Sequence, residues 1–156
     1  MHNQIAVQDT YPEDFAHCYG CGARHATGHR IKTFSADGET VTEYAPGSIY
    51  TGAGEFAYGG IIASLIDCHS TGSAAIFWMR EHDIEIGDEP AARFVTARLE
   101  VDFVAPTPLG MWRLVGRAEE IGDRKVIVKT DLQVNSVTTA RGRAVLVKVS
   151  RHHEGA

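Results

Sequence analysis

The chain is poor in cysteine and has no cluster of basic residues. Its three cysteines are an odd number, and one of them lies inside an apolar segment. This excludes a disulfide-based secreted scaffold and favours a reducing compartment. The net charge is -5 and the 15 basic residues are scattered, so the charge pattern of a nucleic-acid-binding protein is also missing. We therefore expect a small-molecule ligand.

Several common signals are absent as well. The opening MHNQIAVQDTYPEDF lacks a cationic segment followed by an apolar one, so no secretory signal is visible and we expect a cytoplasmic protein. Neither a Gly-x-Ser-x-Gly elbow nor a Walker-type loop occurs, which removes the serine-hydrolase and nucleotide-hydrolase classes. No repeat or linker divides the 156 residues. We expect an arm at 1–28, one main domain at 29–150 and a tail at 151–156.

Only one long apolar segment is present, GGIIASLIDCHSTGSAAIFWM at residues 59–79. A membrane span needs about 20 apolar residues, but polar and small residues fill the centre of this segment, and no second span follows. A helix that is apolar on all faces is typical of a protein core. Asp67, the only acid in it, should be costly to bury unless it is paired, hydrogen-bonded or protonated. It is either a hydrogen-bonded core acid or a catalytic carboxyl.

Segments with strand character surround this helix. Asp37-Gly38 and Asn135-Ser136 have the composition of tight hairpin turns, and Gly122-Asp123 joins two further strands. In the alternating segment 94–104, Leu99 falls on one face and Thr96 on the other. The expected strands are 30–35, 40–45, 94–104, 111–121, 125–134 and 139–149. The order β-β-α-β-β-β-β predicts an α+β fold in which a curved antiparallel sheet of about six strands wraps around one long central helix.

The start of the helix has the features of an anion site. Tyr58 is followed by Gly59 and Gly60, two residues without side chains, where the free N–H groups of a helix can stabilise a developing oxyanion. Gly59 and Asp67 lie about 12 Å apart along one helix. They cannot reach the same carbonyl group, so we expect a dimer in which Gly59 of one chain and Asp67 of the other face one substrate.

Two motifs carry a family resemblance. The run YGGIIASLID and the later pattern VTARLEVDFVAPTPLG resemble the hotdog-fold acyl-CoA thioesterase superfamily, in particular its phenylacetyl-CoA thioesterase-like branch. The opening CYGCGARHATGHRIKTF is similar to an N-terminal CxxCG segment of many such proteins, so the resemblance extends from Cys18 to Val149. It implies that the Gly59 amide polarises a thioester carbonyl and that Asp67 acts as general base or nucleophile. Thr96 matches a hydroxyl residue that orients water in some relatives.

The chain also departs from the family pattern. The family usually has histidine where this chain has Tyr58, and a tyrosine can donate a hydrogen bond but cannot act as a base near neutral pH. An asparagine that is often found six residues earlier is Gly52 here. The resemblance still implies thioester hydrolysis without a cofactor, by a homodimer or a dimer of dimers, with neither nucleic acid nor a membrane as partner.

Four further residues are expected to contact the substrate, and two other functions are considered. We expect Phe56 and Gly60 to contact the acyl group, and Arg124 and Lys125 either to meet the phosphates of coenzyme A or to form a solvated turn. An acyl thioester hydratase or dehydratase would need an Asp–His pair, but His69 points about 200° round the helix from the acid two residues earlier. A non-catalytic protein that binds acyl-CoA or an aromatic ligand stays open because the usual histidine is missing.

A metal site is also possible on paper. Cys18 and Cys21 are spaced as in zinc sites, and His17, His25 and His29 lie near them in the sequence. A second Cys-x2-Cys pair is missing, and the glycines of CYGCG favour a tight turn. We therefore expect no metal.

Overall fold

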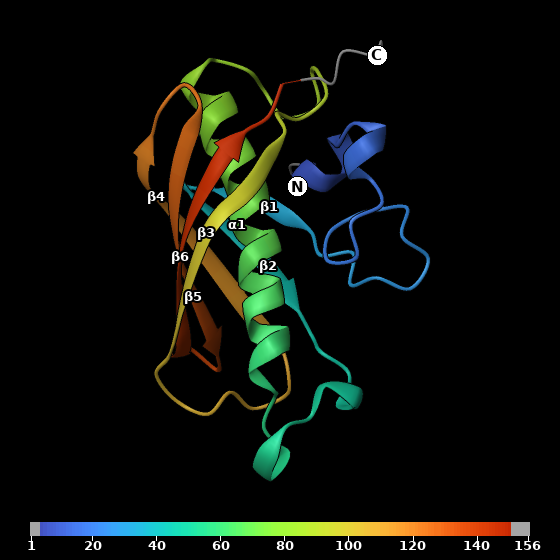
Figure 1. Ribbon diagram of the computed structural model, residues 1–156, viewed down its shortest axis with the longest axis vertical. Helices are drawn as coiled ribbons and strands as arrows, with labels where there is room; N and C mark the ends of the chain where they lie inside the picture. The colour runs from blue at the N-terminus through green and yellow to red at the C-terminus, as the bar shows by residue number, and fades with distance from the viewer. Residues whose placement is uncertain (1–3, 151–156) are drawn as a thin grey trace.

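One long helix lies against a six-stranded antiparallel sheet in the computed structural model (Figure 1), which describes residues 4–150. The predicted tail at 151–156 and the first three residues of the arm lie outside the described residues. The remaining arm contains two short 3-10 helices, η1 (Val7–Thr10) and η2 (Glu13–Phe15). The helix is α1 (Gly59–Glu81), and the strands are β1 (Thr33–Ala36), β2 (Glu39–Tyr44), β3 (Phe94–Phe103), β4 (Trp112–Ile121), β5 (Lys125–Val134) and β6 (Val137–Lys148). The predicted hotdog architecture is confirmed.

The strands follow the order β1-β2-β4-β5-β6-β3, which leaves β1 and β3 at the two edges of the sheet. The hairpin turns are formed by the expected residues. Asp37 and Gly38 both have positive φ, and so do Asn135 and Ser136. These are the conformations that a two-residue hairpin loop requires, and short polar side chains or glycine tolerate them best.

The helix α1 is long and apolar enough to cross a membrane, but 72% of its apolar window is buried inside this protein. Its two halves pack into two apolar clusters against the sheet. One cluster surrounds Phe77 and Met79, and the other surrounds Leu65 and Ile66, with Trp112 of β4 fully buried beside them. Burial of most of the helix explains why it needs no wide polar face, and between its two ends only a narrow stripe that includes Ser64, Asp67 and Thr71 is partly exposed.

A bulge in β3 corrects the predicted alternation. The pairing of β3 with β6 shifts register between Thr96 and Arg98, so Ala97 is an extra residue in the strand. Beyond it the inward face changes phase: Thr96 lies toward α1 before the bulge, and Leu99 packs into the core after it. The prediction that these two residues face opposite sides was wrong, because a strict period of two cannot anticipate an inserted residue.

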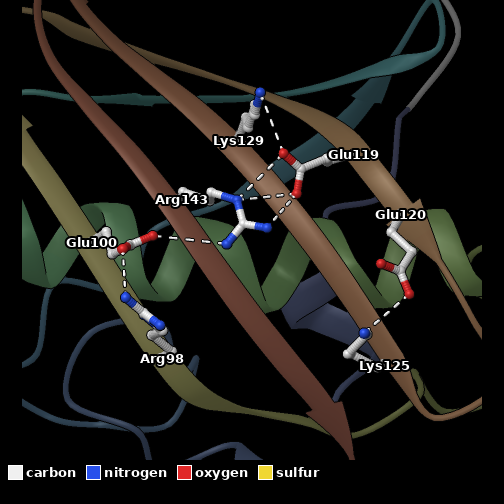
Figure 2. Close-up of polar contacts among 7 residues, drawn as sticks. All are labelled: Arg98, Glu100, Glu119, Glu120, Lys125, Lys129 and Arg143. Carbon is white, nitrogen blue, oxygen red and sulfur yellow. Dashed lines mark hydrogen bonds and ion pairs between the residues drawn. The ribbon is translucent and has the colours of Figure 1, made fainter.

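Charged residues cover the outer face of the sheet, on the side away from α1. Figure 2 shows Arg143 of β6 between Glu119 of β4 and Glu100 of β3, with Lys129 of β5 nearby. The shortest contact joins Arg143 Nη2 to Glu119 Oε2 at 2.6 Å. The carboxylate raises the pKa of Arg143, and the guanidinium lowers that of Glu119. These pairs are partly solvated, so each contributes little to stability.

Candidate active site

Asp67 and Thr96 meet where α1 faces β3. Asp67 is half-buried, and Thr96 Oγ1 donates a hydrogen bond of 2.5 Å to its Oδ1 atom. The β3 bulge follows directly after the threonine and gives it this orientation. Among residues 4–150, Thr96 is the hydrogen-bond partner of this carboxylate. The second oxygen, Oδ2, has no hydrogen-bond partner among these residues.

The environment tunes this carboxyl toward base chemistry. Burial raises the pKa of Asp67 above its ordinary value, the bond from Thr96 lowers it, and negative charge at Cys18 raises it further. The net effect is a raised pKa. A carboxylate whose pKa moves toward neutrality is a stronger general base than a solvated one.

A cleft of about 570 Å³ opens beside this pair. It lies between the arm, α1 and the start of β3, and its walls combine apolar side chains with the acid and several thiols. The lining residues are Tyr11, Asp14, Phe15, His17, Cys18, Cys21, Asp67, Cys68, Thr71, Ala92, Phe94, Val95 and Thr96. A larger cleft of about 970 Å³ lies near Trp78 and Lys148, but Asp67 does not line it. The smaller cleft is the candidate active site.

The helix start is exposed, and packing explains part of its sequence. The Tyr58 ring stacks on Tyr50 with ring centres 6.3 Å apart. It also covers Gly60, where an added Cβ would lie only 2.4 Å from Tyr58 Cε2. A Cβ on Gly59 would lie 3.2 Å from the Phe103 ring. As the first residue of α1, Gly59 has an N–H group without a partner inside the helix.

One chain does not bring the predicted site residues together. Neither Gly59 nor Tyr58 lines the cleft of Asp67. Phe56 is paired with Pro108 in the loop that directly precedes the first residue of α1, Gly59. The structure therefore joins Asp67 to Thr96 and leaves the oxyanion candidate at a separate location, as the helix length predicted.

The predicted phosphate-binding pair lies at the other end of α1. Arg124 and Lys125 belong to the β4–β5 hairpin, which is held to the helix by a 3.0 Å bond from Trp78 Nε1 to the carbonyl oxygen of Asp123. Lys125 Nζ also lies 3.1 Å from Glu120 Oε1 on the outer face of the sheet (Figure 2). A helix of 23 residues spans about 35 Å. In a single chain the pair is therefore remote from Gly59.

His69 is a core histidine, as predicted. It is 0% exposed, and its Nδ1 atom lies 2.8 Å from Thr42 Oγ1. Its Nε2 atom is near the Ser73 and Thr40 hydroxyls, at 3.3 and 3.5 Å. Burial lowers the pKa of His69 to about 3. It therefore stays neutral and takes no part in the cleft.

Sequence reasoning did not place Cys68 beside Cys18 and Cys21. The arm folds over α1 and brings Cys18 and Cys21 to Cys68, so that the three sulfur atoms lie within 4.8 Å of one another. All three thiols are free. Hydrogen bonds from the other two thiols lower the pKa of Cys18, and the pKa of Cys21 rises to about 12. The position of Cys68 directly after Asp67 was the available signal, but only the fold shows that the arm reaches it.

The nearby histidines do not join this cluster. His17 Nε2 lies 2.9 Å from Glu13 Oε1, and His29 Nδ1 lies 2.9 Å from the Tyr44 hydroxyl. The structure therefore does not bring these histidines together with Cys18 and Cys21 as zinc ligands.

The fold and the motifs agree with a known structure. A crystal structure of a thioesterase superfamily protein from Shewanella loihica PV-4 is similar to this chain, with 38% sequence identity, coverage of 92% of this chain and 99% of that one, and a TM-score of 0.69. This chain belongs to the thioesterase superfamily. The resemblance seen in its motifs is confirmed at that level, and no family model or curated protein matches it.

Two structures of lower sequence identity share the fold. A phenylacetic acid degradation-related protein from Ralstonia eutropha JMP134 is 18% identical, with coverage of 78% and 86% and a TM-score of 0.60. A protein from Streptococcus mutans UA159, solved with acetyl-CoA bound, is 16% identical, with coverage of 77% and 89% and a TM-score of 0.61. These two structures show the fold alone, and the 38% identical structure is the one that makes this chain a thioesterase-type hotdog protein.

Proposed function

We propose that this thioesterase-superfamily protein hydrolyses an acyl-CoA thioester to the free acid and CoA. The observation that carries the proposal is the Asp67–Thr96 pair, a carboxylate of raised pKa in a cleft of about 570 Å³. CoA as the substrate class is supported by the similar fold from Streptococcus mutans, which binds acetyl-CoA. The free thiols suit the cytoplasm, which we propose as the location.

The reaction is a water attack. The carboxylate of Asp67 takes a proton from water at Oδ2 as the water oxygen bonds to the thioester carbonyl carbon. Thr96 holds Oδ1 and so fixes the orientation of the carboxylate. The carbonyl oxygen becomes an oxyanion that accepts a hydrogen bond from Gly59 N–H, and its collapse breaks the C–S bond. The CoA sulfur leaves with the proton that Asp67 held.

The Gly59 amide comes from a second chain in this proposal. β3 is an edge strand, and Val95, Phe103 and the following Val104 are 43, 55 and 49% exposed. A long edge strand with exposed apolar residues is ready to pair with another strand. Antiparallel pairing of two β3 strands would set two α1 helices in opposite directions, so that each Gly59 approaches the partner's Asp67. This supports a homodimer, alone or within a dimer of dimers.

Other roles are less well supported. A hydratase would need a histidine beside Asp67, and His69 lies in the core among hydroxyl groups instead. Phosphate binding by Arg124 and Lys125 stays a prediction, and Lys125 would have to leave Glu120. The remaining alternative is a non-catalytic protein that binds acyl-CoA or an aromatic ligand. This alternative is favoured by Tyr58, which is exposed and stands where the family usually has histidine.

A panel of acyl-CoA substrates with free-thiol detection tests the proposal. Hydrolysis releases CoA, whereas hydration or simple binding does not. Asp67→Asn should lower kcat by about 100-fold or more, because general-base assistance is worth at least that factor. Asp37→Asn, in a hairpin turn that asparagine tolerates, is the matched control. Binding of acyl-CoA without thiol release across the panel would favour the non-catalytic alternative.

A further inference from the structure

The three thiols beside the active-site cleft have the arrangement of a metal site. Cys18 Sγ lies 3.9 Å from Cys68 Sγ, and all three sulfur atoms are within 4.8 Å of one another. Sulfur atoms that share one tetrahedral Zn²⁺ at about 2.3 Å lie about 3.8 Å apart. A disulfide would need about 2.05 Å. The cluster therefore has the spacing of metal ligands.

The local backbone is built to hold this cluster. The N–H group of Gly22 donates a 2.8 Å hydrogen bond to the carbonyl oxygen of Cys18, which closes the turn that carries Cys18 and Cys21. Gly20 is required for the loop to reach the helix, because an added Cβ would lie 2.3 Å from Cys68 Sγ. The loop backbone at Gly20 therefore packs directly against the Cys68 thiol of α1, with no room for a side chain between them.

We propose that Cys18, Cys21 and Cys68 bind one soft divalent cation, Zn²⁺, with its fourth position open to the cleft. Three thiolates in a compact set favour Zn²⁺ over hard cations, which prefer oxygen ligands. All three cysteines line the cleft; Cys21 and Cys68 are 4 and 8% exposed, and Cys18 is the exposed one. Binding displaces the thiol protons and ties the arm to α1 next to Asp67. This proposal departs from our expectation of no metal, which considered Cys18 and Cys21 with the nearby histidines and did not include Cys68.

The test is a Co²⁺ titration of the full chain after chelator treatment and reduction, with all three thiols confirmed by free-thiol counting in denaturant. Co²⁺ should saturate at one equivalent per chain, with sulfur-to-metal absorption in the near ultraviolet and the visible bands of tetrahedral Co²⁺. Added Zn²⁺ should remove both signals. Zn²⁺ should also raise the thermal midpoint, because it binds the folded chain. None of these readouts depends on thioesterase activity.

Single variants define the ligands. Cys68→Ser and Cys18→Ser should each weaken Co²⁺ binding by about 100-fold or more, since even supporting residues around metal sites are worth 10- to 100-fold. Gly20→Ala should weaken it as well. His25→Gln, whose ring packs on Tyr19, should bind like the wild type. If Cys68→Ser fails to fold because its site is buried, Cys18→Ser still tests the metal site, because Cys18 is exposed.

Three results would overturn the proposal. The first is a fully reduced wild-type protein without the Co²⁺ spectrum. The second is a folded Cys68→Ser variant that binds as tightly as the wild type, which would assign the metal to other ligands. The third is formation of a disulfide between two of these cysteines on mild oxidation of a protein that binds no metal when reduced, which would identify a redox pair.

Discussion

At the scale of single residues, the site depends on one hydrogen bond that the sequence could not reveal. Thr96 was identified by resemblance alone, and regular alternation placed it on the wrong face relative to Leu99. The inserted Ala97 turns Thr96 toward Asp67, where it donates to Oδ1 at 2.5 Å. Asp67 could be singled out from the sequence, because burying a lone acid in an apolar helix costs free energy unless the acid is paired, hydrogen-bonded or protonated.

Thr96→Val should lower kcat and shift the pH profile. A hydrogen bond to a charged group contributes about 1.5–3 kcal/mol, so we expect a loss of about 10- to 100-fold. The bond lowers the pKa of Asp67, so its removal should move the acid limb of the rate profile to higher pH. Thr96→Ser, which keeps the hydroxyl, should restore both values. A Val variant with an unshifted acid limb and normal kcat would show that Thr96 does not position the base.

Tyr58→Phe should change kcat by less than about tenfold. The ring stacks on Tyr50 and covers Gly60, and the variant keeps both contacts. Only a neutral hydrogen bond of about 0.5–1.5 kcal/mol could be lost. The measurement is the kinetics on the best substrate of the acyl-CoA panel. A loss of more than a hundredfold would mean that the phenol takes part in the chemistry.

At the scale of elements, the sequence predicted the order of strands and helix and most turns. Turn chemistry and periodicity are local, so Asp37-Gly38 and Asn135-Ser136 could be read directly. The path of the arm is not local. Gln8 of η1 bonds Thr33 of β1, and Cys18 reaches Cys68 across 50 residues. Contacts of this kind, between segments distant in the sequence, form the walls of the cleft. No short sequence pattern predicts them.

Buried polar contacts between α1 and β2 make stability depend on pH. The pKa of His69 is about 3 in the folded chain and about 6.5 when unfolded. Below pH 6.5 the unfolded chain therefore binds a proton that the folded chain excludes, and the free energy of unfolding falls as pH falls. The slope from this group is at most about 1.4 kcal/mol per pH unit.

Chemical denaturation between pH 7 and 5.5 measures this slope. Asp67 has a raised pKa and acts in the opposite direction, and this contribution is present both in the wild type and in a His69 variant. His69→Gln lacks the titrating group and should show a flatter pH dependence, although its stability at pH 7 should be lower. An equal slope in the two proteins would show that His69 is not held neutral in the core.

At the scale of the whole molecule, the account requires two chains for one site. The cleft contains Asp67 and Thr96 but not Gly59, and the edge strand β3 exposes apolar side chains. Gly59→Pro is a sharp probe, because proline removes the N–H group and is tolerated at the first position of a helix. Tyr58 before it has φ -72° and ψ 149°, a conformation compatible with a following proline. Gly59→Ala, which keeps the N–H group, is the matched control.

Activity of mixed dimers tests the shared site most directly. Asp67→Asn and Gly59→Pro homodimers should both be nearly inactive, and Gly59→Ala should retain more activity than Gly59→Pro. A purified heterodimer of the Asn and Pro chains has one site with an intact Asp67 and an intact Gly59, so it should recover about half of the wild-type kcat per dimer. Verified heterodimers that stay as inactive as the parents, or a monomer in light scattering that hydrolyses acyl-CoA at the full rate, would contradict the account.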